Sequence, residues 1–431
     1  MKKKTVLRFS AVLIVAALLA GTFDLLPKAS AETVDPKTNN IQWSLSDDGV
    51  LTITGNGAMD KYDWADAPWR SSGNKIKTVI IENGVTSIGN RAFYNCRNLT
   101  SVKIPDSVTS IGEFAFTGCS LTSVTIPDSV TDIKHSAFEG CGRLSSVTIP
   151  DSVTSIGSWA FGGCVSLKSV TIPNSVTSVG YAAFSNCKNL SSVSIPDSVT
   201  SIGDSAFEYC KSLSSVTIPD SVTSIGDGTF YACESLKSVT IPDSVTSIGD
   251  YAFNNCNNLS SVTIPSSVTS IGEWVFEECY SLCTFNVDEG NPAYCSVNGV
   301  LFNNNLTELV CYPTGKSESS YTIPDGVTSI GNRAFSYCES LNSVMISGSV
   351  TDIRYAAFEY CKSLSSVTIS DSVTNIEDSA FYCCDSLSDV YYTGTKAQWK
   401  AVSIAPWKGI YSARNKDGLN NATIHCSDGD I

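Results

Sequence analysis

The sequence predicts a solenoid that is mainly β, in which twelve stacked coils of about 23 residues lie between two β-rich caps. A phenylalanine recurs every 23 residues through most of the chain, with one spacing of 22 and one of 59, and a cysteine follows each phenylalanine by three residues. Because one repeat cannot bury its own apolar residues, stacked neighbours must bury them for each other in one continuous core. The twelve anchors are Phe93, Phe116, Phe138, Phe161, Phe184, Phe207, Phe230, Phe253, Phe276, Phe335, Phe358 and Phe381.

The local structure of one coil follows from its residues. Val147 and Ile149 alternate with Ser and Thr, which predicts a short strand with one buried face. Pro150-Asp151-Ser152 ends this strand with a turn, and Gly157 permits a sharp bend after a second apolar stretch. The segment around Phe161 fits a short helical or 3-10 turn. With strands about 4.8 Å apart, twelve coils span roughly 60–70 Å.

The repeat resembles that of a known family. Its consensus, Ile-Pro-Asp-Ser-Val-Thr-Ser-Ile-Gly-x-x-Ala-Phe-x-x-Cys, is similar to the repeat of the BspA-like leucine-rich-repeat family over about residues 76–390. The flanks at 43–55 and 390–399 also look like that family's usual neighbours. The resemblance implies a leucine-rich-repeat solenoid in a secreted or surface-exposed bacterial protein that adheres to host or neighbouring-cell molecules. It implies no catalytic residues.

Residues 1–31 have the pattern of a secretory signal peptide. Three lysines at 2–4 precede an almost continuously apolar run over 9–23, and Ala29-Ser30-Ala31 fits a cleavage site. An uncleaved membrane anchor is the alternative, but no stop-transfer pattern follows the apolar run. We therefore expect a secreted or cell-surface protein that begins at Glu32 and does not insert into a membrane after cleavage.

The charge balance narrows the class of partner. The chain carries 28 basic and 42 acidic residues, a formal net charge of −14. Cleavage after residue 31 leaves 23 basic against 41 acidic residues. Such a surface disfavours nucleic acid and anionic membranes, since both bind basic faces. We expect a monomer whose partner is an extracellular protein or glycan.

Breaks in the repeat register divide the exported chain into five parts: a cap at 32–75, repeats at 76–282, an insertion at 283–320, repeats at 321–390 and a second cap at 391–431. In the first cap, two alternating stretches within residues 41–55 predict a β-hairpin over the first coil. The insertion predicts a second hairpin that includes Phe302 and Tyr312. This hairpin is either a contact site that projects from the rod or an enlarged coil tolerated on one face.

The chain contains 17 cysteines, of which twelve hold equivalent positions in successive repeats. Zinc is disfavoured because these cysteines occur singly, without nearby histidines. Disulfides between coils are conceivable, since Cα atoms about 5 Å apart lie within the allowed range, but equivalent side chains point the same way. We expect a ladder of buried, unpaired thiols. Five cysteines lie off the ladder: Cys283, Cys295, Cys311, Cys383 and Cys426.

The aspartates that follow the repeat proline are the strongest candidate metal ligands. Asp106, Asp128 and Asp151 occupy consecutive repeats, and Ca²⁺ could bridge carboxylates stacked in this way. Hydrogen bonding within each turn is the alternative, and Asn174 and Ser266 interrupt the column. Turn chemistry is the favoured interpretation, so no metal site is assigned.

No motif of catalysis or cofactor binding is present. Two histidines in 431 residues argue against a histidine metal site or proton relay. The sequence also lacks a phosphate-binding loop, a Gly-x-Ser-x-Gly elbow and a His-Glu-x-x-His motif. We expect no enzyme activity and no cofactor.

Three functions remain open: an adhesion or binding scaffold, a passive envelope spacer, and a binder of repetitive polysaccharide through the Ser/Thr strand face. A site that selects one partner must vary between coils, and the positions after Ile-Gly vary most. Large aromatics and Arg most often dominate binding energy. The candidate contact residues are therefore Arg91, Phe114, Trp159, Tyr251, Trp274 and Arg333, together with Phe302 and Tyr312 of the inserted hairpin.

Overall fold

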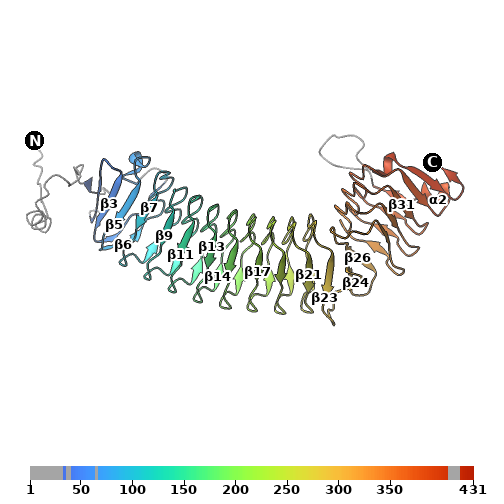
Figure 1. Ribbon diagram of the computed structural model, residues 1–431, viewed down its shortest axis with the longest axis horizontal. Helices are drawn as coiled ribbons and strands as arrows, with labels where there is room; N and C mark the ends of the chain where they lie inside the picture. The colour runs from blue at the N-terminus through green and yellow to red at the C-terminus, as the bar shows by residue number, and fades with distance from the viewer. Residues whose placement is uncertain (1–32, 35–39, 64–66, 406–417) are drawn as a thin grey trace, which may run out of the picture.

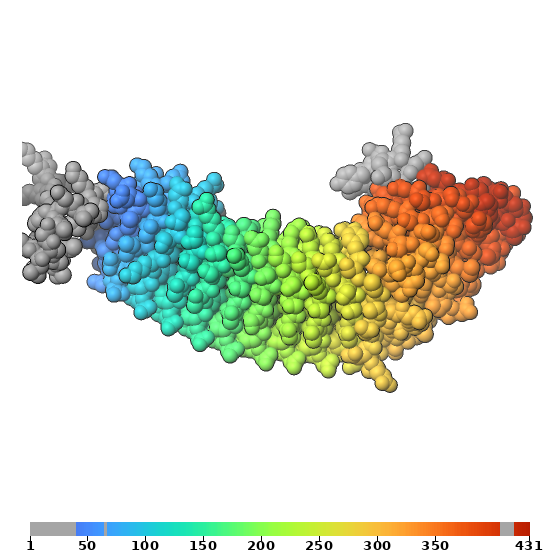
Figure 2. All heavy atoms as spheres, viewed as in Figure 1, coloured from blue at the N-terminus to red at the C-terminus, as the bar shows by residue number. Residues whose placement is uncertain are grey.

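The computed structural model describes residues 33–34, 40–63, 67–405 and 418–431. Its coils stack side by side into a shallow arc with one cap at each end (Figure 1). The space-filling view shows the same bowed outline, which rises where the colour changes from yellow to orange near the insertion (Figure 2). The expected signal peptide lies outside the described residues. Within the described ranges, no helix is long and apolar enough to cross a membrane.

The first strand of each coil forms a ladder of parallel strands along one side of the solenoid. Equivalent residues pair directly, so Val147 lies beside Val124 and Thr148 beside Thr125. The Val side chains face the core and the Ser and Thr side chains are mostly exposed. These strands are β5 (Thr78–Ile81), β7 (Ser101–Lys103), β9 (Ser123–Thr125), β11 (Ser146–Thr148), β13 (Ser169–Thr171), β15 (Ser192–Ser194), β17 (Ser215–Thr217), β19 (Ser238–Thr240), β21 (Ser261–Ile264), β23 (Thr284–Val287), β27 (Ser320–Thr322), β29 (Ser343–Met345), β31 (Ser366–Ile369) and β33 (Asp389–Tyr392).

A second, shorter strand follows the Pro-Asp-Ser turn and forms another parallel ladder. Its Ile or Val is buried in nearly every coil, as expected from the alternation. These strands are β4 (Gly57–Ala58), β6 (Val85–Ile88), β8 (Ser110–Ile111), β10 (Asp132–Ile133), β12 (Ser155–Ile156), β14 (Ser178–Val179), β16 (Ser201–Ile202), β18 (Ser224–Ile225), β20 (Ser247–Ile248), β22 (Ser270–Ile271), β28 (Ser329–Ile330), β30 (Asp352–Ile353), β32 (Asn375–Ile376) and β34 (Ser403–Ile404).

A run of hydrogen-bonded turns closes each coil, where the sequence predicted a short helical or 3-10 turn. The Cys96 N–H donates to the Phe93 carbonyl at 3.1 Å within one coil. Alternate N–H groups reach the next coil instead, as Phe93 donates to the Ala115 carbonyl at 2.8 Å. In the described ranges, helical elements are short and lie in the caps: η1 (Arg70–Ser72), α2 (Lys396–Trp399) and η2 (Gly418–Asn421).

Both ends of the solenoid are covered by antiparallel strands. The predicted N-terminal hairpin is confirmed, because β2 (Ile41–Leu45) pairs antiparallel with β3 (Val50–Gly55), and β3 pairs with β5 of the first coils. A short strand, β1 (Thr33–Val34), adds to β2. At the other end β35 (Thr423–Cys426) pairs with β33 and with β36 (Gly429–Asp430).

The inserted segment forms three antiparallel strands: β24 (Tyr294–Val297), β25 (Val300–Asn303) and β26 (Glu308–Cys311). The predicted hairpin is therefore confirmed, but the idea that it projects from the rod is wrong. Its last strand, β26, pairs in parallel with β28 and so continues the ladder of second strands. The hairpin is part of the solenoid wall.

The structure contains about fourteen coils instead of twelve. Trp69 takes the anchor position in the first cap and stacks on Phe93 with ring centroids 5.7 Å apart. Tyr312 takes it in the coil of β26 and stacks on Phe335 at 5.0 Å. A search for Phe alone misses both coils because the anchor site accepts any large aromatic ring.

The prediction of one continuous core is wrong, although all twelve Phe anchors and all twelve ladder cysteines are buried as expected. The buried residues form two clusters that meet at Val300 and Leu301 in β25. At this point the ring stack breaks, because Phe276 meets Phe285 edge-on at 67° instead of meeting another anchor face to face.

Candidate binding surface on the turn side of the coils

The variable residues lie on the segment between the Ile-Gly pair and the cysteine of each coil, which we call the turn face. The second residue after Ile-Gly has a positive φ, 57° at Arg91, 57° at Trp159 and 56° at Tyr251. This left-handed backbone lets its N–H donate to the next coil, as Trp159 does to the Tyr181 carbonyl at 2.9 Å. The backbone is thus fixed by the stack, while the side chain is free to vary between coils.

The predicted contact residues fall into three separate groups and do not form one site. Near the first cap, the Arg91 guanidinium lies 4.7 Å from the centroid of the Phe114 ring. In the middle, Trp159 packs edge-on against Tyr181 at 5.8 Å. All of these except Tyr181 are only partly exposed, because each side chain lies against its neighbour in the adjacent coil.

The third group crosses the insertion. Tyr251 stacks on Trp274 with ring centroids 4.6 Å apart. The Arg333 guanidinium lies 5.4 Å from the Trp274 ring and 5.3 Å from the Tyr355 ring. Arg333 follows Trp274 by 59 residues, so the structure brings together two predicted contact residues that lie far apart in the sequence.

Phe302 and Tyr312 are not contact residues. Their exposed fractions are 0% and 1%, so neither can touch a partner. Phe302 is buried because β25 lies in the sheet between β24 and β26, and Tyr312 is buried because it replaces a Phe anchor.

Sequence reasoning missed four exposed tyrosines. Two of them directly precede the positive-φ position, one directly precedes the cysteine and one directly follows it, and all are 37–48% exposed: Tyr181, Tyr355, Tyr209 and Tyr280. The overlooked signal is that aromatic residues also occur, in some coils only, at three further positions. These are the residue before the positive-φ position, the residue before the cysteine and the residue after it. Most of the exposed aromatic surface lies at these positions.

A cavity of about 190 Å³ opens on the turn face at the insertion. In a complete coil four residues separate Ile330 from Phe335, whereas only two separate Leu309, which pairs with Ile330, from the anchor Tyr312. The coil of β26 therefore lacks the two variable residues, and their absence leaves a gap in the row. The cavity is lined by Glu273 and Trp274 from one side and by β26 and the two following coils from the other.

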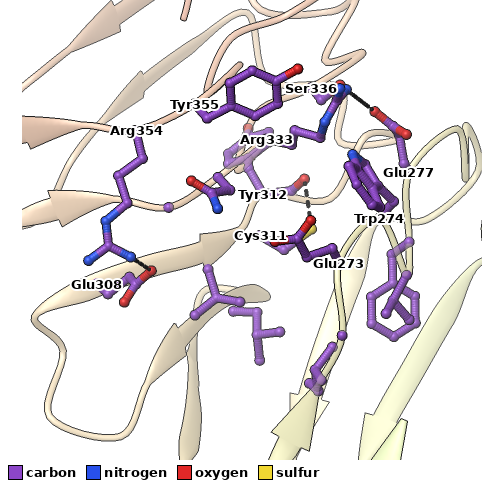
Figure 3. Close-up of a pocket in the computed structure, with 18 of the residues that line it drawn as sticks. Glu273, Trp274, Glu277, Glu308, Cys311, Tyr312, Arg333, Ser336, Arg354 and Tyr355 are labelled. Atoms are coloured by element: carbon purple, nitrogen blue, oxygen red, sulfur yellow. Dashed lines mark hydrogen bonds and ion pairs between the residues drawn. The ribbon is translucent and has the colours of Figure 1, made fainter. Parts of the chain in front are cut away.

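Ion pairs close the two sides of this cavity (Figure 3). The Arg333 guanidinium pairs with the Glu277 carboxylate at 2.9 Å and also with Glu359. Arg354 pairs with Glu308 at 2.6 Å. Burial lowers the pKa of Arg333, but the carboxylates of Glu359 and Glu277 outweigh burial and hold that pKa above its usual value.

Among the described residues, no group of three or more His, Cys, Asp or Glu is placed to hold a metal ion. The serine beside each Asp of the repeat Pro-Asp-Ser turn has a structural role, since the Ser152 hydroxyl donates to the Val130 carbonyl of the preceding coil at 2.6 Å.

A stack of strand-and-turn coils with a Leu in every repeat defines the class of leucine-rich-repeat solenoids. The model of the BspA type Leucine rich repeat region (6 copies) matches residues 71–191, 181–307 and 308–401. The chain belongs to this family.

Three solved structures of leucine-rich-repeat proteins are similar to this chain. A leucine-rich repeat protein from Bacteroides ovatus is 27% identical, with a TM-score of 0.60 over 86% of this chain and 99% of that chain. A leucine rich cell surface protein from Faecalibacterium prausnitzii is 29% identical, with a TM-score of 0.49 over 88% and 98%. A leucine-rich repeat protein from T. pallidum is 26% identical, with a TM-score of 0.34 over 58% and 91%. The comparison with curated proteins gives no match.

Proposed function

We propose that the protein is exported to the bacterial cell surface or beyond and acts there as a non-enzymatic scaffold that binds an extracellular protein or glycan through its turn face. Membership of a leucine-rich-repeat family supports a binding role, because solenoids offer long surfaces to other macromolecules. The signal-peptide pattern at residues 1–31 supports export.

The exposed tyrosines of the turn face carry this proposal. Ten large hydrophobic residues are exposed in the described part of the chain, and four of them are turn-face tyrosines: Tyr181, Tyr209, Tyr251 and Tyr355. A tyrosine ring buries a large area at low entropic cost and is enriched among residues that dominate binding energy. Exposing several of them on one face is therefore typical of a recognition surface.

Binding of the purified protein to arrays of extracellular-matrix proteins and glycans tests the proposal. The triple variant Tyr181→Ser, Tyr251→Ser and Tyr355→Ser should lose binding while its circular dichroism spectrum stays that of the folded protein. The matched control is Met345→Ser with Tyr391→Ser, which removes side chains that are 51% and 47% exposed on the first-strand side. Equal binding by both variants, or no ligand on either array, contradicts the proposal and favours a passive spacer.

The hydroxyl lattice of the first-strand ladder favours a second candidate, a repeating polysaccharide. Ser146 and Thr148 pair in register with Ser123 and Thr125, and all four are exposed. Lysine substitutions at Thr148, Thr217 and Thr240 should abolish binding if this lattice is the site. They should leave binding intact if the turn face is the site.

Export has its own test. N-terminal sequencing of protein secreted from a bacterial host should find Glu32 first. A chain that retains Met1 in the membrane fraction contradicts export with cleavage and indicates an anchor.

A further inference from the structure

Four consecutive coils differ from the rest of the turn face in charge. Their segments, residues 203–210, 226–233, 249–256 and 272–279, contain no Lys or Arg. They contain seven carboxylates: Asp204, Glu208, Asp227, Asp250, Glu273, Glu277 and Glu278. The five preceding segments hold two carboxylates, together with Arg91 and Lys134. The acidic character is therefore local and does not simply follow from the net charge of the chain.

One column of these carboxylates is held in place by the coil stack. The Asp227 N–H donates to Asp204 Oδ1 at 3.1 Å, and the Asp250 N–H donates to Asp227 Oδ1 at 2.9 Å. The Glu273 N–H continues the series by donating to Asp250 Oδ1 at 2.8 Å. The carboxylates of Asp204, Asp227 and Asp250 are thus each oriented by a backbone bond, so a ligand would not have to order them on binding.

Aromatic rings run beside the carboxylate column. Tyr209 packs edge-on against Tyr231 at 5.2 Å, Tyr231 meets Tyr251 at 6.5 Å, and Tyr251 stacks on Trp274. Tyr209 and Tyr251 are 37% and 39% exposed. The surface thus offers aromatic rings and carboxylates, the two kinds of group to which guanidinium and ammonium ions bind.

The chain itself supplies one example of such binding. Arg333 reaches across the insertion and places its guanidinium on the Trp274 ring while it pairs with Glu277. The same combination of ring and carboxylate occurs at Asp250 with Tyr251, but the described residues place no basic side chain in an ion pair there. The cavity lies at the end of the row and shares Glu273 and Trp274 with it.

We propose that this acidic and aromatic row, residues 204–274 of the turn face with the cavity at its end, binds an extended protein segment rich in Arg or Lys. The inference rests on the proposed binding function and names the chemistry of the partner. Four coils spaced by about 4.8 Å give a row of about 14 Å, which is the length of about four extended residues. Two basic side chains on one face of the segment lie over the row, and a third enters the cavity.

Fluorescence polarisation with a labelled (Ser-Arg)4 peptide tests the inference, with (Ser-Gln)4 and (Ser-Glu)4 as control peptides. The isosteric triple variant Asp227→Asn, Asp250→Asn and Glu273→Gln keeps, at positions 227 and 250, a side-chain oxygen that accepts the backbone bond. Its affinity for (Ser-Arg)4 should fall by about tenfold or more, because close charge pairs dominate such complexes. The matched control, Asp106→Asn with Asp128→Asn and Asp151→Asn, removes three exposed carboxylates after the repeat proline and should change affinity by less than about twofold.

Three other outcomes contradict the inference, and a fourth bears only on the proposed function. Equal weakening in the two triple variants means that (Ser-Arg)4 senses only net charge, and equal affinity for (Ser-Gln)4 means that the row does not select basic groups. If an array ligand is lost in the tyrosine variant but (Ser-Arg)4 does not bind, the proposed function stands and this inference fails. If (Ser-Arg)4 binds as expected but no array ligand is found, the row is basic-selective and the broader proposal lacks its partner.

Discussion

At the scale of single residues, the constant letters of the repeat each join one coil to the next. Ten ladder cysteines donate their thiol hydrogen to the carbonyl of the anchor in the preceding coil at 3.0–3.3 Å, as Cys187 does to Phe161. The Thr177 hydroxyl donates to the Thr154 carbonyl in the same manner. The cysteine is therefore constant because it is small, buried and able to donate one hydrogen bond, and its redox chemistry is not needed to explain it.

The thiols should differ sharply in reactivity. Burial raises the pKa of Cys141, Cys187 and Cys256 to about 12, so at pH 8 almost no nucleophilic thiolate exists on the ladder. Iodoacetamide should modify the exposed Cys283 first and the ladder roughly a thousandfold more slowly. Peptide mapping by mass spectrometry measures both.

Unfolding in denaturant is the control, since it should equalise the rates. Ladder cysteines that stay unmodified in denaturant without reductant would reveal disulfides between coils and contradict the prediction of free thiols.

One residue at the C-terminal end should make stability depend on pH. His425 contacts Asp389 through Nε2 at 3.0 Å and Asp430 through Nδ1 at 2.9 Å, and the hydrogen bonds to Asp389 and then Asp430 raise the pKa of its imidazole. A raised folded-state pKa means that the protonated ring stabilises the fold below the unfolded-state pKa of about 6.5. This contribution is lost as the pH rises through the folded-state pKa.

Thermal melts between pH 5 and pH 8 and an NMR titration of the imidazole check this. The wild-type melting temperature should fall more between these values than that of His425→Gln. Identical pH profiles for the two proteins contradict the prediction.

At the scale of one element, a coil tolerates substitutions only at positions whose side chains lie outside the buried core. The anchor must be a large ring that stacks on the next, whereas the residue two positions earlier is held with positive φ and takes Arg, Phe, Trp, Tyr, Ser or Ala. Gly228 occupies this position in one coil with φ of 57°. Recognition residues can therefore diverge without disturbing the core.

Tyr312 is an exception among the anchors and yields an element-scale prediction. Its hydroxyl is buried and has no hydrogen-bond partner in the described structure. An unpaired buried hydroxyl costs about 1–3 kcal/mol. Tyr312→Phe should therefore raise the free energy of unfolding by about 1 kcal/mol, as measured by urea denaturation.

Phe335→Tyr is the reciprocal control, because it places a hydroxyl in the equivalent buried site and should destabilise. A loss of stability in Tyr312→Phe would mean that the hydroxyl is satisfied, for example by a buried water.

At the scale of the whole molecule, the solenoid consists of two hydrophobic clusters joined at the insertion. Across this junction the ring stack is broken, and Arg333 takes over part of the coupling by binding Glu277 and Trp274 on one side and Glu359 and Tyr355 on the other. Its side chain is 20% exposed. Stability in repeat arrays is a sum of coil and interface contributions, so a weak interface should act as a boundary between cooperative units.

Arg333→Met should separate the unfolding of the two halves. The substitution leaves Glu277 and Glu359 without their shared cation, which costs about 3 kcal/mol for a mostly buried pair. Differential scanning calorimetry should then show two transitions, or a wider separation of two existing ones.

Lys211→Met is the matched control, because it breaks the exposed pair with Glu234 between two coils that precede the junction and should change the profile little. A single unchanged transition in Arg333→Met contradicts a coupling role for this residue.

The sequence by itself determined the repeat, the buried Phe and Cys columns, the strand alternation and the first cap hairpin, because each depends on local pattern repeated many times. It could not show that Trp69 and Tyr312 act as anchors, since only a ring stacked on its neighbour distinguishes an anchor from any other aromatic. Tertiary structure alone decided that the core divides at β25, that Arg333 meets Trp274, and that a cavity opens beside them. The contact and the cavity arise beside a coil two residues short at its variable positions, and the effect of that shortening becomes visible only when neighbouring coils are stacked.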